Sequence, residues 1–125
     1  MNVVVAGLLG AGLLGSLAAC GGISASTKER LAQTQTAVQQ AQNTIGTSEN
    51  GAVELQRARE YLETGRRAAD NGKEGQALRY ATEAQLQAEL AVAKAQSATA
   101  RKAAADMLAS IEALRNEAVR EPLTR

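Results

Sequence analysis

Residues 77–98, ALRYATEAQLQAELAVAKAQSA, carry an alanine at alternating spacings of four and three residues. A repeat of this kind places every member on one face of an α-helix, as at the contact positions of a coiled coil. Because alanine has a small side chain, this alanine seam lets neighbouring helices approach closely. The stretch therefore predicts an all-α fold built from Ala-rich helices with coiled-coil packing. The members of the seam are Ala77, Ala81, Ala84, Ala88, Ala91, Ala95 and Ala98.

The sequence before the seam predicts two further helices. A capping box of the form S-x-x-E begins at Ser26, and turn residues at 46–51 interrupt the pattern that follows. Gly72 ends the second helical segment, since glycine suits the left-handed conformation after a helix, and Pro122 stops the third. We therefore expect an Ala-rich helical domain over residues 27–121, with helices at about 27–45, 51–71 and 73–121.

Two arrangements of these helices fit the pattern. Folding the chain about Gly72 lays residues 27–71 antiparallel to residues 73–117, and we expect this long, interrupted antiparallel hairpin of three helices. The hairpin would bring together Leu31 and Leu114, and also Tyr61 and Tyr80. The alternative is a compact three-helix bundle, in which the bulkier residues from Met107 to Leu114 would project without a partner unless a second molecule covered them.

The chain before Lys28 differs in composition, because it contains no charged residue. Its convincingly apolar part, Val3 to Leu17, is shorter than the roughly 20 residues of a membrane-spanning helix and has the length of a signal-peptide core. Residues 10–15 spell G-x-G-x-x-G, but no second strand follows to complete a nucleotide-binding unit. We therefore interpret this segment as an export signal, although Met1 and Asn2 lack the usual positive charge.

The end of this segment, Leu17-Ala18-Ala19-Cys20, resembles the lipobox of bacterial lipoproteins. In that class an aliphatic residue and two small residues precede a cysteine whose thiol takes a diacylglyceryl group as a thioether. Cleavage then makes the cysteine the new N-terminus, which is usually acylated as well. Stable anchoring needs two or more acyl chains, and this modification supplies them.

The lipobox resemblance divides the N-terminal region and implies a location. It implies a signal peptide over residues 1–19 and a lipidated N-terminus with a short leash over residues 20–26. Gly21 follows the cysteine, where lipoproteins kept in the inner membrane often carry Asp, so sorting to the outer membrane is favoured. The alternative is that the segment stays uncleaved as an inner-membrane anchor.

Residues 51–95 also resemble a family of small Ala-rich helical envelope proteins of Gram-negative bacteria, which is known only as a domain of unknown function. The members are typically lipoproteins, and some carry an OmpA-like peptidoglycan-binding domain after the helical part. Because the helical part alone carries the resemblance, peptidoglycan binding is not extended to this chain. The residues that match are Glu54, Leu55, Ala58, Leu62, Ala68, Gly72, Ala77, Ala81, Glu83, Ala84, Ala88, Glu89, Leu90, Ala91 and Ala95.

The composition argues against catalysis. The 125-residue chain has no histidine, which excludes the usual general base and His-containing metal sites, and lipid would consume its single cysteine. The formal net charge is +1, so no strong field attracts nucleic acid. We expect a protein that is not an enzyme and has no cofactor and no metal site, and the sequence identifies no small-molecule substrate.

The pattern thus favours a lipid-anchored protein on the periplasmic face of the outer membrane that acts as a helical spacer, scaffold or adaptor. Its expected partners are the membrane, through lipid on Cys20, and a protein of the cell envelope or a second copy of the chain. Alternatively, it is a binding subunit that docks an envelope complex or a peptide. The contact residues would be Met107, Leu108, Ile111 and Leu114.

Overall fold

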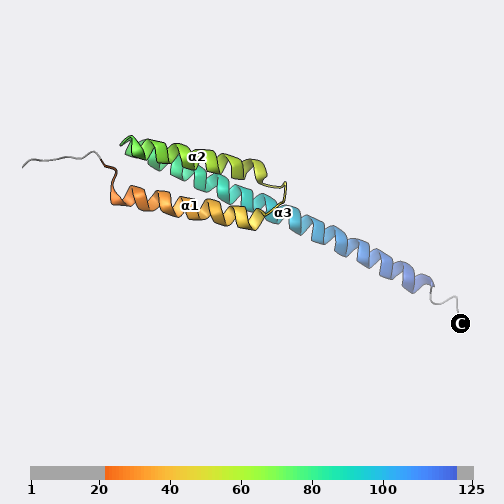
Figure 1. Cartoon of the computed structure of the whole chain (residues 1–125). Helices are drawn as coiled ribbons and strands as arrows, with labels where there is room; N and C mark the ends of the chain where they lie inside the picture. The colour runs from red at the N-terminus through yellow and green to blue at the C-terminus, as the bar shows by residue number, and fades with distance from the viewer. Residues whose placement is uncertain (1–21, 121–125) are drawn as a thin grey trace, which may run out of the picture.

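The computed structural model describes residues 22–120, which contain three α-helices in an all-α fold (Figure 1). Helix α1 spans Ala25–Ile45, α2 spans Ala52–Asp70 and α3 spans Glu74–Arg120. The predicted all-α fold with packed helices is therefore confirmed. The expected signal peptide and the lipobox from Leu17 to Cys20 lie outside the described residues.

The helices form a three-helix bundle, which is the alternative arrangement that the sequence allowed, and not the expected long hairpin. Helix α1 lies beside the first half of α3 and runs parallel to it, while α2 runs antiparallel to both (Figure 1). Two hydrogen bonds fix the register of α1 on α3. Thr27 Oγ1 donates to the Glu74 carboxylate, and Thr34 Oγ1 shares its proton between the Arg30 carbonyl oxygen of α1 at 2.9 Å and the Ala81 carbonyl oxygen of α3 at 3.3 Å. Leu31 consequently packs inside the bundle and does not meet Leu114, which is exposed on the projecting part of α3.

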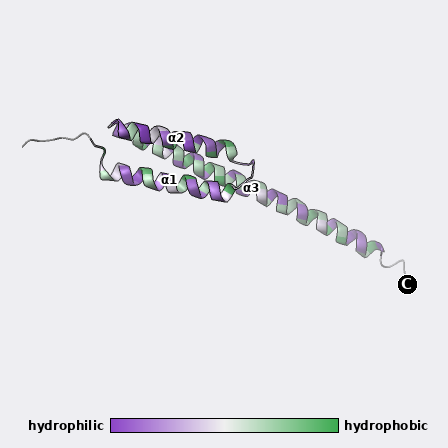
Figure 2. Ribbon diagram, in the orientation of Figure 1, coloured by the Kyte–Doolittle hydropathy of each residue, from purple (hydrophilic) through white to green (hydrophobic). Residues whose placement is uncertain are grey.

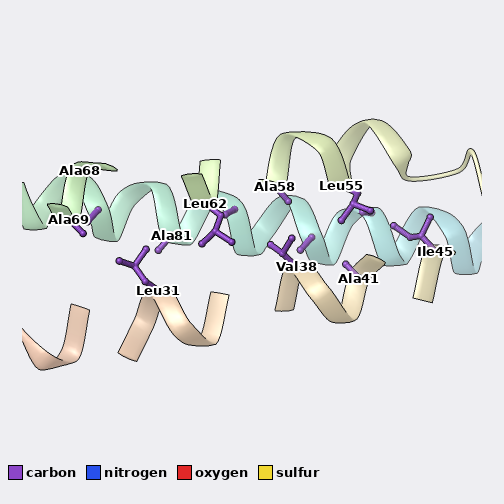
Figure 3. Packing of buried hydrophobic residues seen from close by; sticks show 14 of the residues in the cluster. Leu31, Val38, Ala41, Ile45, Leu55, Ala58, Leu62, Ala68, Ala69 and Ala81 are labelled. Carbon is purple, nitrogen blue, oxygen red and sulfur yellow. The ribbon is translucent and has the colours of Figure 1, made fainter. Parts of the chain in front are cut away.

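The small side chains of the alanine seam explain why α1 folds back against α3. The described buried residues of α3 are all alanines, each of which buries little area by itself. With two helices against this narrow face, large side chains from both sides converge on it: Leu31, Val38 and Ile45 from α1, and Leu55 and Leu62 from α2 (Figure 3). Burying one such side chain contributes about 1.5–3 kcal/mol. A two-helix hairpin would leave one side of every such residue in water.

The expected antiparallel pairing of the second and third helices is confirmed. Gly72 adopts a φ of 67°, and Lys73 N–H donates to the Ala68 carbonyl at 2.8 Å in the hydrogen-bond pattern of a Schellman cap. Tyr61 and Tyr80 stack with ring centroids 6.2 Å apart, as the fold about Gly72 predicts. The turn between α2 and α3 thus forms where turn chemistry places it.

The start of α1 differs from the expected capping box. Ser24, not Ser26, is the N-cap, and its hydroxyl accepts a hydrogen bond from the Thr27 N–H at 3.3 Å. Ser26 already lies inside the helix. Both serines have the chemistry of an N-cap, and Ser24 also donates to the carboxylate of Glu74. This contact from α3 adds a partner that the local sequence does not contain.

Replacing Gly51 with alanine is expected to destabilise the bundle. Gly51 precedes α2 with a φ of 89°, and an added Cβ would lie 2.3 Å from the carbonyl oxygen of Ala91. The left-handed conformation alone costs a non-glycine residue about 1–3 kcal/mol, and the clash adds to that cost. Urea unfolding followed by circular dichroism should therefore show a loss of about 2 kcal/mol or more.

Gly75→Ala is the matched control, because a Cβ at Gly75 meets nothing within 4 Å. Alanine is the better helix former by up to about 1 kcal/mol, so this variant should be as stable as the wild type or more stable. An equal effect of the two substitutions would contradict the close approach of Gly51 to α3.

Candidate functional site

The second half of α3 projects from the bundle as a single helix, which we call the arm and define as residues 101–120. All of its residues are exposed, whereas the last buried residue of α3 is Ala95 (Figure 1). The arm begins where its neighbours stop, since α1 ends at Ile45 and α2 starts at Ala52. At 1.5 Å per residue the arm is about 30 Å long.

The predicted contact residues lie on this arm. Their exposed fractions are 65% for Met107, 67% for Leu108, 50% for Ile111 and 70% for Leu114. The spacings of Met107, Ile111 and Leu114 place them on one side of the helix, with Leu108 beside them. Figure 2 shows hydrophobic residues recurring along the arm among hydrophilic ones. The structure thus brings the four residues together and leaves them uncovered by α1 and α2.

Charged groups secure the end of the bundle from which the arm leaves. Lys94 Nζ on α3 donates to Glu54 Oε1 on α2 at 2.5 Å. The Glu54 side chain is only 9% exposed, while that of Lys94 is 52% exposed. The hydrogen bond from Lys94 lowers the pKa of Glu54, and the backbone N–H at the start of α2 lowers it further. The carboxylate is therefore held in its charged form across the α2–α3 interface.

A second carboxylate joins the helices at the opposite end of the bundle. Glu74, in the first turn of α3, accepts hydrogen bonds from the hydroxyls of Ser24 and Thr27 at the start of α1. These bonds, led by the one from Ser24, lower the pKa of Glu74. They tie the beginning of α1 to the beginning of α3. The chain therefore enters the bundle at one end, and the arm leaves at the other.

Sequence reasoning missed both carboxylate contacts, because their partners are 40 and 47 or more residues away. The available signal was local: Glu54 and Glu74 each lie in the first turn of a helix, where a negative charge is favoured. That signal predicts an acidic residue at a helix start without naming its partner.

Two features are absent from residues 22–120. These residues hold no group of three or more Cys, Asp, Glu or His side chains that could bind a metal ion. Within the same part of the chain, no helix is long and apolar enough to cross a membrane. Cys20, the predicted lipidation residue, and Leu17, Ala18 and Ala19 before it are not among the described residues, and their role stays a prediction.

A comparison with known families matches residues 29–107 to the family described as Domain of unknown function (DUF4398). The matched region covers most of α1, all of α2 and α3 as far as Met107. No curated protein and no solved structure gives a significant match. The chain therefore belongs to the DUF4398 family, whose function is unknown. The secondary structure of the matched part of this chain consists of α-helices.

The stability of the bundle should fall at acidic pH through Glu54 and Glu74. Their folded-state pKa values lie below the unfolded value of about 4.3, so the stabilisation is present above that pH and is lost as the pH falls through the folded values. Urea unfolding at pH 7 and pH 3 measures the loss. The double variant Glu54→Gln, Glu74→Gln should show a smaller difference between the two pH values.

Glu112→Gln is the control for this experiment, because Glu112 lies on the exposed arm, away from the bundle. This variant should retain the pH dependence of the wild type. If the double variant also retains it in full, the two carboxylate contacts do not stabilise the fold.

Proposed function

We propose that this protein is a lipoprotein of the outer membrane that faces the periplasm and acts as a non-catalytic helical spacer, scaffold or adaptor. The observation that carries the proposal is that the chain enters the bundle at one end and the arm leaves it at the other. The segment that leads back to Cys20 joins α1 at one end, and the arm leaves at the opposite end (Figure 1). A molecule anchored at its first end therefore presents the arm away from the anchor.

The proposed anchor is Cys20. Its thiol takes the diacylglyceryl group as a thioether, and cleavage before Cys20 frees the amine for a further acyl chain. Ser24, the N-cap of α1, follows four residues later, so the leash spans about 14 Å at most. The beginning of the bundle is then held close to the membrane surface.

The proposed spacer is α3. Its 47 residues form a helix about 70 Å long at 1.5 Å per residue. Helices α1 and α2 stiffen the half nearest the membrane, and the arm carries its exposed apolar residues to the far end. This arrangement fits a protein that holds a contact surface at a set distance from the membrane.

The exposed residues of the arm support a second candidate function. Met107, Leu108, Ile111 and Leu114 are each at least half exposed, and a large uncovered apolar cluster commonly marks an interaction site. In this alternative the protein is a binding subunit that docks an envelope complex or a peptide through the arm.

The anchor is tested by labelling cells with radioactive palmitate. The wild-type chain should incorporate the label and Cys20→Ala should not, because only the thiol of Cys20 forms the thioether. Ala19→Ser keeps a small residue before the cysteine and serves as the matched control that should still be labelled. Equal labelling of wild type and Cys20→Ala would overturn the lipoprotein proposal.

Separation of inner and outer membranes on a sucrose gradient then tests the location. The labelled wild-type protein should be found with the outer membrane. An unlabelled, uncleaved chain in the inner membrane would instead indicate that the leader remains as the anchor.

A further inference from the structure

A second repeat of apolar residues runs along α3 outside the bundle core. From Leu86 to Ala118, spacings of four and three residues alternate without interruption, and each position on this repeat is leucine, isoleucine, methionine, alanine or serine. We call it the outer stripe. Its ends carry the large residues, which are Leu86 and Leu90 at one end and Met107, Ile111 and Leu114 at the other. The positions between 93 and 104 are alanine or serine.

The outer stripe lies on the side of α3 that faces away from the bundle. Each of its members from Leu86 to Ala100 follows a member of the alanine seam by two residues, which is a rotation of about 200° around a helix. The exposure agrees with this geometry. Ala84 and Ala88 of the seam are at most 1% exposed, whereas Leu86 and Leu90 are 53% and 44% exposed.

The length and spacing of the outer stripe are those of a coiled-coil contact face. It covers more than four heptads, or about 48 Å of helix, and crosses from the bundle onto the arm without a change of phase. A second helix with the same heptad repeat can contact such a stripe along its whole length. The surface of a globular protein does not offer a matching repeat over this length. The required occupant is thus a helix with the same repeat.

We propose that this occupant is α3 of a second copy of the chain, paired in parallel and in register along the outer stripe. In this register the large ends of the two stripes meet each other, and the alanine and serine positions meet in the middle. Helices α1 and α2 cover the buried alanine seam of α3 and leave the stripe residues exposed, so they do not obstruct the contact. The proposal does not depend on lipid anchoring.

The charges that flank the outer stripe favour the parallel orientation. In a parallel coiled coil, contacts between the flanking g and e positions join residues five positions apart on the two helices. On this stripe the g positions come just before Leu90, Ser97 and their heptad equivalents. This rule places Glu89 opposite Lys94 and Gln96 opposite Arg101, with no like charges facing each other. Lys94 also binds Glu54 of its own chain, but its ammonium group has three donors and its side chain is half exposed.

The antiparallel orientation brings like charges together. With the stripes fully overlapped, Arg101 would face Arg101 of the second copy, and Glu89 would face Glu117. Sliding the helices by one heptad would instead place Lys94 against Arg101 twice. Like charges at these flanking positions disfavour the pairing.

The oligomeric state is tested with the full chain carrying Cys20→Ser, so that the experiment is independent of lipidation. Sedimentation equilibrium in a density-matched detergent should give twice the chain mass of 13.0 kDa. The double variant Ile111→Glu, Leu114→Glu should dissociate, with the apparent Kd raised on the order of 100-fold or more. All substituted residues are exposed, so circular dichroism should show unchanged helix content.

Ala109→Glu is the matched control, because Ala109 is an exposed residue of the arm that lies off the outer stripe. It should remain a dimer. A wild-type chain that is monomeric at all concentrations, or an equal effect of Ala109→Glu, would overturn the proposal.

The orientation is tested by disulfide formation in the same Cys20→Ser background. Ala93→Cys lies on the outer stripe and should form a dimer through a disulfide with its own counterpart, while Ala109→Cys should not. In the antiparallel registers, residue 93 would face residue 111 or 104 of the second copy. Disulfides only in mixtures of Ala93→Cys with Ile111→Cys or Ala104→Cys would therefore overturn the parallel arrangement.

Discussion

The small size of the alanines on α3 is the constraint on which the rest of the structure depends. All the buried positions of α3 among the described residues are alanine, so this helix is narrow on the side that enters the bundle. Two helices can then flank it closely, and Gly51 comes close enough to Ala91 that no Cβ would fit between them. The large buried side chains come from α1 and α2 instead. In this core the alanines of α3 let the helices approach closely, and α1 and α2 provide most of the buried large apolar side chains.

This division leaves the large apolar residues of α3 on its outside. Leu86, Leu90 and Ile111 would each stabilise a core if they were buried, yet each is about half exposed. Scattered exposed leucines are ordinary, but a regular repeat that continues from the bundle onto an unsupported helix is informative. It makes α3 a helix with two contact faces. One face is occupied within the chain, and the other extends beyond the reach of α1 and α2.

Much of this fold follows from the sequence, because its strongest signals are local. The alanine seam predicts a packed helix, Gly72 predicts the turn, and folding about that turn predicts the contact between Tyr61 and Tyr80. The place of α1 could not be obtained in the same way. The connection at residues 46–51 permits either a continued or a reversed chain, and periodicity alone reports only that α1 has an apolar face.

The contacts that fix α1 are also invisible to local reasoning. Glu74 receives the hydroxyls of Ser24 and Thr27 only after the chain has reversed twice, and Glu54 meets Lys94 only across the α2–α3 interface. That the candidate contact residues share one side of a helix was predictable because they repeat at helical spacing, while their role stays a prediction. That they are uncovered follows from the length of α1 and α2, not from their own sequence. The lipobox at Leu17 to Cys20 remains a prediction of the sequence.

The reversal of α1 changes the direction in which the arm points relative to the N-terminal end of the bundle. In a hairpin folded about Gly72, residues near 27 and 117 would be neighbours, and an anchor at Cys20 would hold the tip of the arm at the membrane. In the bundle, α1 and α3 start at the same end, so the arm points away from the end at which the segment with the proposed anchor joins α1 (Figure 1). Two copies anchored in one membrane would then have their α3 helices pointing in the same direction. The parallel pairing favoured by the charges beside the outer stripe is therefore also the pairing that a shared membrane would allow.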